Sequence, residues 1–142
     1  MLPRTAMLIV TTPAIAAQKV ASRAADMARK GFLRVAGVIE NMSAFTCDHG
    51  ESYALFGTGG GARLAADVGV PLLGSIPLDP SVAAGGDAGT PPALADEGPV
   101  SAAFAAIAAR VALEALPAVP DLAGCTARLF DAVEQRLGPV TA

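Results

Sequence analysis

The sequence lacks several features that define common classes of protein. It has no tryptophan, a single histidine and only two cysteines in 142 residues, which excludes the disulfide framework of a small secreted domain. No apolar run approaches the roughly 20 residues that a membrane-spanning helix needs. Its 13 acidic residues outnumber the 10 basic ones, which excludes a basic surface for nucleic acid. We therefore expect a cytoplasmic protein with reduced thiols that binds neither nucleic acid nor membrane.

Apolar residues are abundant, at 53%, although aromatic residues make up only 4%. A chain of this length and composition is expected to form one domain with a real core. Because much of the apolar content is alanine, we expect thin, closely packed helices rather than an aromatic core.

The order of the apolar segments predicts a βαβ unit. Met7 to Val10 is a continuous apolar run, typical of a strand that is buried on both faces. Ala14 to Lys30 carries polar residues at helical spacing, with Thr12 as the expected N-cap and Gly31 as the expected stop. Val35 to Ile39 is the second apolar run, and two strands joined in this way by a helix pair in parallel.

The pattern then repeats along the chain. Gly61 to Val68 predicts a helix that Gly69 closes, and Val70 to Ile76 predicts a third strand that ends at Pro77. The segment from Pro77 to Pro99 is rich in glycine, proline and aspartate, which is typical of a surface loop.

The last part of the chain is predicted to be helical. Ser101 to Leu116 predicts a helix whose inner face carries Phe104, Ile107, Val111 and Leu116. We expect one unit over residues 1–116, followed over 117–142 by a proline-broken linker and a terminal helix that Asp121 caps. The fold class is therefore α/β: a partial doubly wound parallel sheet of about three strands with flanking helices. Neither edge of so small a parallel sheet is visibly protected, so the chain looks incomplete.

Polar residues follow the predicted strands at the ends where ligands bind in open α/β sheets. Asn41 follows the second strand, and Pro77 and Asp79 follow the third. An asparagine offers both a hydrogen-bond donor and an acceptor to a planar base, which suits adenine. Alternatively, Asn41 ends its strand through local backbone hydrogen bonds, and both interpretations stay open.

The glycine run from Gly57 to Gly61, followed by Ala62, fits the G-x-G-x-x-A dinucleotide fingerprint. The residues before it, Tyr53 to Phe56, are too few for the strand that this fingerprint follows. The run also lacks the Gly-Lys-Ser/Thr ending of a P-loop. We interpret it as a mobile connector rather than a phosphate cradle.

Cys47 and His49 lie two residues apart in a segment of small and polar residues, and both side chains are competent metal ligands. Alone they make half of a four-ligand site, which two-fold pairing of chains would complete. The alternative is a buried thiol beside a surface histidine, without a metal.

Three longer stretches carry a family resemblance: "MLIVTTPAIAAQKV", "VAGVIENMSAFTC" and "ALFGTGGGARLAADVGVPLLGSIPLD". Their order and spacing, from about Met7 to Arg110, resemble the C-terminal half of the Mrp/ApbC-type iron–sulfur cluster carriers, which belong to the MinD-like P-loop ATPases. The resemblance implies that the chain is the C-terminal part of a P-loop NTPase domain. It also implies that Asn41 contacts adenine and that Pro77 and Asp79 lie near the base and ribose.

In the family that this chain resembles, a Cys-x-x-Cys-Gly motif binds a cluster between two subunits. Here the first cysteine is Cys47 and the second is missing, and His49 is the candidate substitute. The Walker A loop of the family is also absent, so the resemblance implies that this chain does not hydrolyse ATP alone.

The sequence therefore predicts a fragment of an iron–sulfur cluster carrier or assembly ATPase. It would bind the base of ATP through Asn41, Pro77 and Asp79, and a dimer-bridging iron–sulfur cluster through Cys47, with His49 as a second ligand. The expected partners are a second copy or a missing N-terminal half that carries the P-loop, and recipient iron–sulfur apoproteins. Two alternatives stay open: a non-catalytic protein-interaction module, and a small zinc-binding domain that uses Cys47 and His49 across a dimer.

Overall fold

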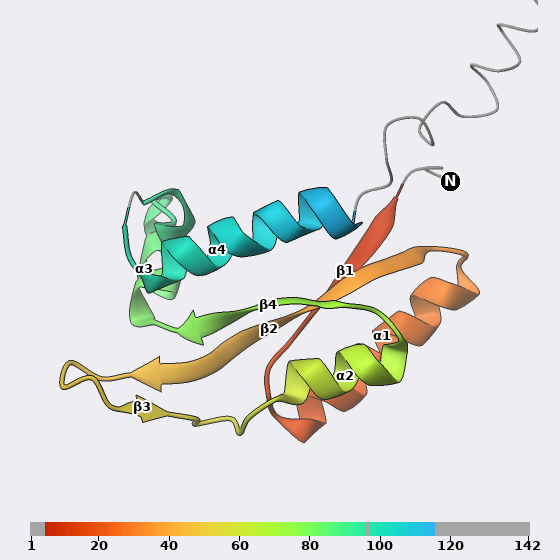
Figure 1. Cartoon of the computed structure of the whole chain (residues 1–142), viewed down its shortest axis with the longest axis horizontal. Helices are drawn as coiled ribbons and strands as arrows, with labels where there is room; N and C mark the ends of the chain where they lie inside the picture. The colour runs from red at the N-terminus through yellow and green to blue at the C-terminus, as the bar shows by residue number, and fades with distance from the viewer. Residues whose placement is uncertain (1–4, 96, 116–142) are drawn as a thin grey trace, which may run out of the picture.

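The computed structural model describes residues 5–95 and 97–115, which form one twisted sheet with helices on both faces (Figure 1). Helices α1 and α2 cover one face of the sheet, and α4 lies across the other. The elements, in chain order, are β1 Ala6–Thr11, α1 Ile15–Lys30, β2 Arg34–Thr46, β3 Ser52–Tyr53, α2 Gly60–Val68, β4 Leu72–Leu78, α3 Pro80–Ala88, the 3₁₀ turn η1 Pro92–Leu94, α4 Pro99–Arg110 and the π-helical turn η2 Val111–Ala115.

Strand β2 is the centre of the sheet. It pairs in parallel with β1 from Ala6↔Arg34 to Thr11↔Glu40, and in parallel with β4 from Val38↔Leu72 to Phe45↔Leu78. Strand β3 pairs with the end of β2 in the antiparallel sense, at Phe45↔Tyr53 and Thr46↔Ser52. The α/β class and the parallel core are therefore confirmed. The described sheet nevertheless has four strands rather than three, because a short hairpin extends it.

Two of the predicted strands end later than expected, and β4 also begins later, at Leu72 instead of Val70. β2 runs to Thr46 instead of Ile39, because its polar second half still pairs with β4. β4 runs through Pro77 to Leu78, and in the described residues it pairs only with β2. Proline lacks a backbone N–H and is found in sheets mainly on edge strands. β4 is such a strand among the residues described, so it can contain Pro77.

The helix boundaries also differ in part from the prediction. The N-cap of α1 is Ala14, without a side-chain hydrogen bond, so the prediction of Thr12 as N-cap is wrong. Pro13 is fully buried and α1 begins only after it. Gly31 and Gly69 end α1 and α2 as predicted.

The segment from 77 to 99 is not the continuous loop that its composition predicts. It contains α3, which Asp79 caps, Pro80 begins and Gly89 ends in the left-handed conformation (φ 72°). No residue of α3 is buried, so hydrophobic periodicity gave no signal for it.

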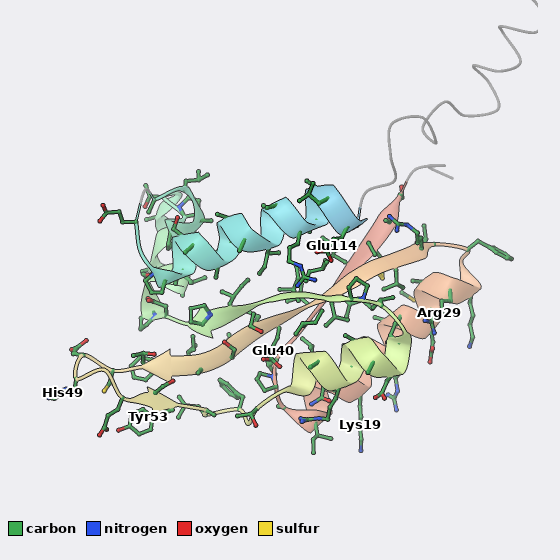
Figure 2. The ribbon with its side chains drawn as sticks, viewed as in Figure 1. Lys19, Arg29, Glu40, His49, Tyr53 and Glu114 are labelled. Carbon is green, nitrogen blue, oxygen red and sulfur yellow. The ribbon has the colours of Figure 1, made fainter. Side chains whose placement is uncertain are left out.

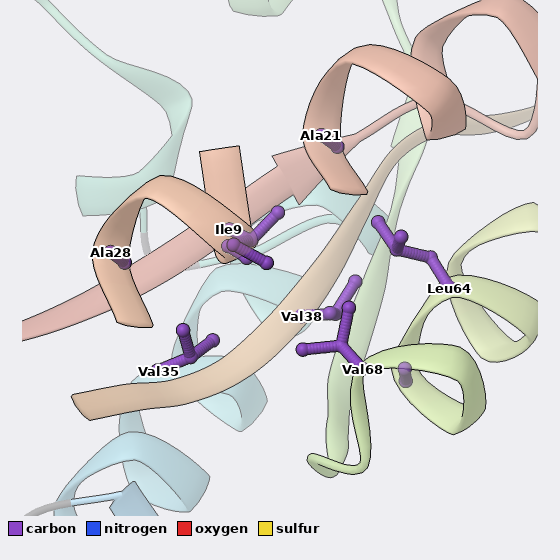
Figure 3. Close-up of a cluster of buried hydrophobic side chains, with 9 residues drawn as sticks. Ile9, Ala21, Ala28, Val35, Val38, Leu64 and Val68 are labelled. Carbon is purple, nitrogen blue, oxygen red and sulfur yellow. The ribbon is translucent and has the colours of Figure 1, made fainter. Parts of the chain in front are cut away.

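The core consists of two clusters, one on each face of the sheet. Figure 3 shows the first, where Ile9 and Val38 of the strands pack against alanines of α1 and against Leu64 and Val68 of α2. The second joins Ile39, Leu73 and Ile76 to Ile107 of α4, with Phe104 and Val111 packed beside them as predicted. Leu116, Asp121 and the predicted terminal helix lie outside the described residues. Among the residues described, no helix is long and apolar enough to span a membrane.

Candidate functional site

The turn between β2 and β3 carries both predicted metal ligands. It is closed by hydrogen bonds from Cys47 N–H to the Glu51 carbonyl and from Gly50 N–H to the Cys47 carbonyl, both 2.9 Å. Gly50 adopts φ 83°, which glycine allows without strain. Cys47 is a half-buried free thiol, and the exposed His49 lies at the far end of the hairpin (Figure 2).

This turn therefore presents one sulfur and one imidazole at the outer end of the sheet. Residues 5–95 and 97–115 contain no group of three or more histidine, cysteine, aspartate or glutamate side chains suited to a metal ion. A tetrahedral centre needs four ligands, so the hairpin of one chain supplies at most half of the donors. The donor set fits a soft metal centre only if a second molecule contributes the rest.

Exposed apolar side chains follow the turn in the sequence. Tyr53, Leu55 and Phe56 are exposed by 46%, 63% and 42%, and they follow the turn within a few residues. The Tyr53 hydroxyl donates a hydrogen bond to the Glu51 carboxylate, which raises the pKa of Tyr53. An apolar surface beside an incomplete metal site is a feature of protein interfaces.

The predicted base-binding residues lie on adjacent strands, but they line different hollows. Asn41 stands opposite Ile76 in the β2–β4 ladder, one residue before Pro77. Pro77 and Asp79 line a pocket together with Phe45 and Thr46 of β2 and Asp48 of the turn. Asn41 instead lines a groove along β1. The structure thus brings Pro77 and Asp79 together, and it brings both next to the Cys47 turn.

Asp79 has a structural role at the start of α3. Its carboxylate accepts a hydrogen bond from Ser81 N–H at 2.8 Å, the geometry of an N-cap. Hydrogen bonds from the Ser81 side chain and then from its backbone lower the pKa of Asp79. A pKa that is lower in the folded state means that the carboxylate stabilises the fold above its unfolded-state pKa, and that this stabilisation is lost as pH falls through the folded pKa.

Replacing Asp79 with alanine is expected to lower the free energy of unfolding by about 1 kcal/mol at neutral pH. The difference from wild type should vanish in acid, once Asp79 is protonated. Urea unfolding followed by far-UV circular dichroism measures this, because the chain has no tryptophan. Asp79→Asn is the control, since asparagine also caps helices but does not titrate. A constant difference between Asp79→Ala and wild type across the acid range would contradict this role.

Sequence reasoning missed Glu40, a carboxylate at the end of the most apolar part of β2. It is only 6% exposed, and its Oε2 accepts a hydrogen bond from Gly61 N–H in the first turn of α2 at 2.5 Å. A negative charge at a helix N-terminus is favourable. The residue could have been found from its charge, because a carboxylate at the end of a buried apolar strand requires a hydrogen-bond donor nearby.

The glycine run is explained by close packing of this helix terminus. A Cβ on Gly60 would lie 2.4 Å from the Pro13 carbonyl oxygen, and one on Gly61 would lie 2.6 Å from Cβ of Glu40. Gly60 and Gly61 are buried and belong to α2, so the prediction of a connector from Gly57 to Gly61 is wrong for these two residues. Gly57 and Gly59 adopt positive φ in the exposed turn before α2.

One edge of β1 pairs with β2, and along its other edge runs an apolar groove. The groove is bordered by Leu8 and Val10 of β1, exposed by 39% and 57%, and by Val20 of α1, exposed by 67%. Among the described strands, none occupies this edge. It is therefore the position at which a further strand extends such a sheet.

The chain is similar to known proteins in sequence and in fold. Residues 1–112 match the family model described as ParA: NUBPL iron-transfer P-loop NTPase. An iron-sulfur cluster carrier protein of Mycobacterium tuberculosis is 47% identical over 97 residues, which cover 64% of this chain and 26% of that protein. The human cytosolic Fe-S cluster assembly factor NUBP2 is 44% identical over 114 residues, which cover 78% of this chain and 41% of that protein. The chain thus spans well under half the length of these relatives.

Solved structures are similar in fold. The cell division ATPase MinD of Pyrococcus furiosus superposes with a TM-score of 0.59 at 24% identity, over 75% of this chain and 41% of that one. MinD of Pyrococcus horikoshii, solved with Mg-ADP, gives a TM-score of 0.57 at 22% identity, over 83% of this chain and 44% of that one. At this identity the likeness establishes the fold, that of MinD-like P-loop ATPases. The family match over residues 1–112 shows that this chain belongs to the NUBPL-type iron-transfer P-loop NTPases.

Proposed function

We propose that this chain carries an iron–sulfur cluster as cargo between two copies of itself, in the cytosol, and delivers it to recipient apoproteins. The observation that carries the proposal is the β2–β3 turn, which presents the half-buried Cys47 thiol and the exposed His49 on one short hairpin. The names of its relatives, iron-sulfur cluster carrier protein and cytosolic Fe-S cluster assembly factor, support the same function and location.

The chemistry of the hairpin suits this cargo. Each chain offers a thiolate and an imidazole, and histidine replaces cysteine at iron in some clusters. A two-fold axis through the hairpins doubles the set to two thiolates and two imidazoles. The exposed Tyr53, Leu55 and Phe56 beside the turn supply apolar surface for the second copy. A shared, exposed site also lets an acceptor thiol approach the cluster directly.

We propose further that a nucleotide base binds near the hairpin, in the pocket that Pro77 and Asp79 line. Asn41 lines the separate groove along β1, so its contact with the base stays a prediction from the sequence. Pro77 and Asp79 share a pocket with Phe45, Thr46 and Asp48, and Phe45 pairs with Leu78 in the ladder. A base in this pocket would contact Phe45 of β2. Cys47 follows Phe45 by two residues in the chain. This contact is a direct route by which nucleotide binding changes cluster retention.

Hydrolysis of ATP needs phosphate contacts from a further segment. The sequence contains no Gly-Lys-Ser/Thr phosphate loop, which provides those contacts in P-loop enzymes. The open edge of β1, with its apolar groove, suits a strand from such a segment. We propose that this edge accepts the P-loop-bearing partner and that the chain alone does not hydrolyse ATP.

Anaerobic reconstitution with iron and sulfide tests the cargo. We expect visible charge-transfer absorption and, by chemical assay, one cluster for every two chains. A colourless protein that binds zinc stoichiometrically would instead support the small zinc-binding domain. A protein that retains no metal would support the non-catalytic interaction module. Either result would contradict the carrier function.

A further inference from the structure

Helix α2 is capped by a residue of β2 rather than by its own N-cap. The N-cap residue is Gly59, which has no side chain to accept a hydrogen bond. The first N–H groups of a helix have no partner within the helix, so they need acceptors from elsewhere. Glu40 of β2 lies beside the start of α2 (Figure 2), and its Oε2 accepts the hydrogen bond from Gly61 N–H, 21 positions further along the chain. The strand therefore provides the cap.

A carboxylate at this position loses most of its hydration, because the Glu40 side chain is only 6% exposed. Among the described residues, the one ion pair is that of Arg110 with Glu114, so no cation lies within ion-pair distance of Glu40. The bond to Gly61 and the positive end of the helix dipole favour the charge instead. A methionine would fill a similar volume without the loss of hydration. The bond is therefore what glutamate contributes here.

The bond between Glu40 and Gly61 closes a loop that contains both candidate metal ligands. The chain leaves along β2, turns at 47–50 and returns through β3 and residues 54–59. Every residue from 48 to 59 is exposed, so burial holds none of them. β3 is two residues long and pairs with β2 at two positions. Because so short a hairpin is marginal by itself, its geometry depends on the two ends at which it is attached.

The two limbs of the hairpin are attached in different ways. The outgoing limb is held by the pairing of β2 with β4, as far as Phe45↔Leu78. The returning limb is held where the chain enters α2. There Gly61 donates to Glu40, and a Cβ on Gly61 would lie 2.6 Å from Cβ of Glu40. Loss of this bond would let the first turn of α2 fray, which lengthens the free segment between β3 and the helix.

We propose that Glu40 is a positioning residue for the cargo: it pins the returning limb of the β2–β3 hairpin to the strand that carries Cys47, and so slows release of the cluster. The inference rests on the proposed function, because it assumes that the hairpin holds a cluster. Glu40 acts through the backbone at Gly61 and not as a metal ligand. Its effect is to keep Cys47 and His49 in one geometry, since a preorganised pair of ligands loses less conformational entropy on binding.

Amide hydrogen exchange of the full, cluster-free chain, resolved by NMR, tests the pin without a metal. In Glu40→Met, the amides of residues 54–61 should exchange about fivefold faster than in wild type, the factor for loss of a helix cap. Glu40→Gln keeps an oxygen that accepts from Gly61 N–H, so its exchange should stay close to wild type. Exchange that Glu40→Met leaves unchanged, or that Glu40→Gln accelerates equally, would contradict the pin.

Transfer of the reconstituted cluster to a chelator, followed by visible absorption, tests the consequence for the cargo. Glu40→Met should release the cluster severalfold faster than wild type, and Glu40→Gln should restore slow release. Ile107→Val is the control, because it removes a methyl group from the buried cluster on the other face of the sheet. It should leave release unchanged. A purely structural role predicts that release follows the free energy of unfolding at either position, and such a correlation would overturn the inference.

The two measurements separate this inference from the proposed function. A wild-type protein that holds a cluster, with Glu40→Met releasing it at the same rate, would overturn the inference alone. A wild-type protein that takes up no cluster would end the carrier function and the inference with it, although exchange would still show whether Glu40 pins the hairpin. If Glu40→Met does not fold by circular dichroism, Glu40→Ala replaces it in both measurements, with the same expected results and the same contradicting ones.

Discussion

Replacing Cys47 with serine is expected to abolish the visible absorption of the reconstituted protein. Cys47 carries the one thiol of the hairpin and is the cluster ligand that we propose, and a hydroxyl is a far weaker ligand for iron in a cluster. We expect iron and sulfide contents of the variant to fall to background after desalting. Absorption spectra and chemical iron assays of samples prepared side by side measure this loss.

Two further variants control this result. Cys125→Ser removes the other thiol of the chain and should leave the cluster intact. His49→Cys offers a second thiolate in the same turn and should bind the cluster at least as tightly as wild type, whereas His49→Ala should release it faster. A Cys47→Ser protein that keeps its colour would contradict the assignment of Cys47 as a ligand.

Gly60→Ala is expected to destabilise the fold by about 1–3 kcal/mol. The new Cβ would lie 2.4 Å from the Pro13 carbonyl oxygen and 2.6 Å from Nε2 of Gln18. These two atoms already form a hydrogen bond of 2.8 Å, so the methyl group would force the start of α1 and the first turn of α2 apart. Urea unfolding followed by circular dichroism measures the free energy of unfolding.

Gly86→Ala is the matched control for this substitution. Gly86 also lies in a helix, α3, but a Cβ there would meet no atom within 4 Å. The same change of residue should therefore be neutral or stabilise the protein, by up to about 1 kcal/mol. Equal losses at both positions would mean that helix packing is not the reason for the glycine run.

The parallel core could be predicted from the sequence, because it depends on continuous apolar runs and helical spacing. Met7 to Val10 lies within β1, and the inner face of α4 is the predicted one. The extension of β2 beyond Ile39 could not be predicted, since Glu40 and Asn41 are polar and their pairing with Ser75 and Ile76 depends on β4 lying beside them. Helix α3 was missed because it buries no residue, and its start depends on a cap rather than on periodicity.

For the candidate site, the sequence predicts that Cys47 and His49 lie close together, but it does not predict what surrounds their turn. Cys47 and His49 were placed in one turn because they lie two residues apart in sequence. The proximity of that turn to Pro77 and Asp79 depends on the β2–β4 register, which no local pattern encodes. The positive φ of Met42 lies at the register shift between β2 and β4, and no local pattern in the sequence indicates it either.

Native mass spectrometry of the anaerobically reconstituted chain tests the central claim most directly. A cluster shared by two hairpins predicts a species of two chains with one cluster, which dissociates to cluster-free monomers when the cluster is removed. The Cys47→Ser protein should give monomers alone under the same conditions. A monomer that carries a complete cluster, or a protein that binds no iron and does not pair, would contradict a cargo held between two copies.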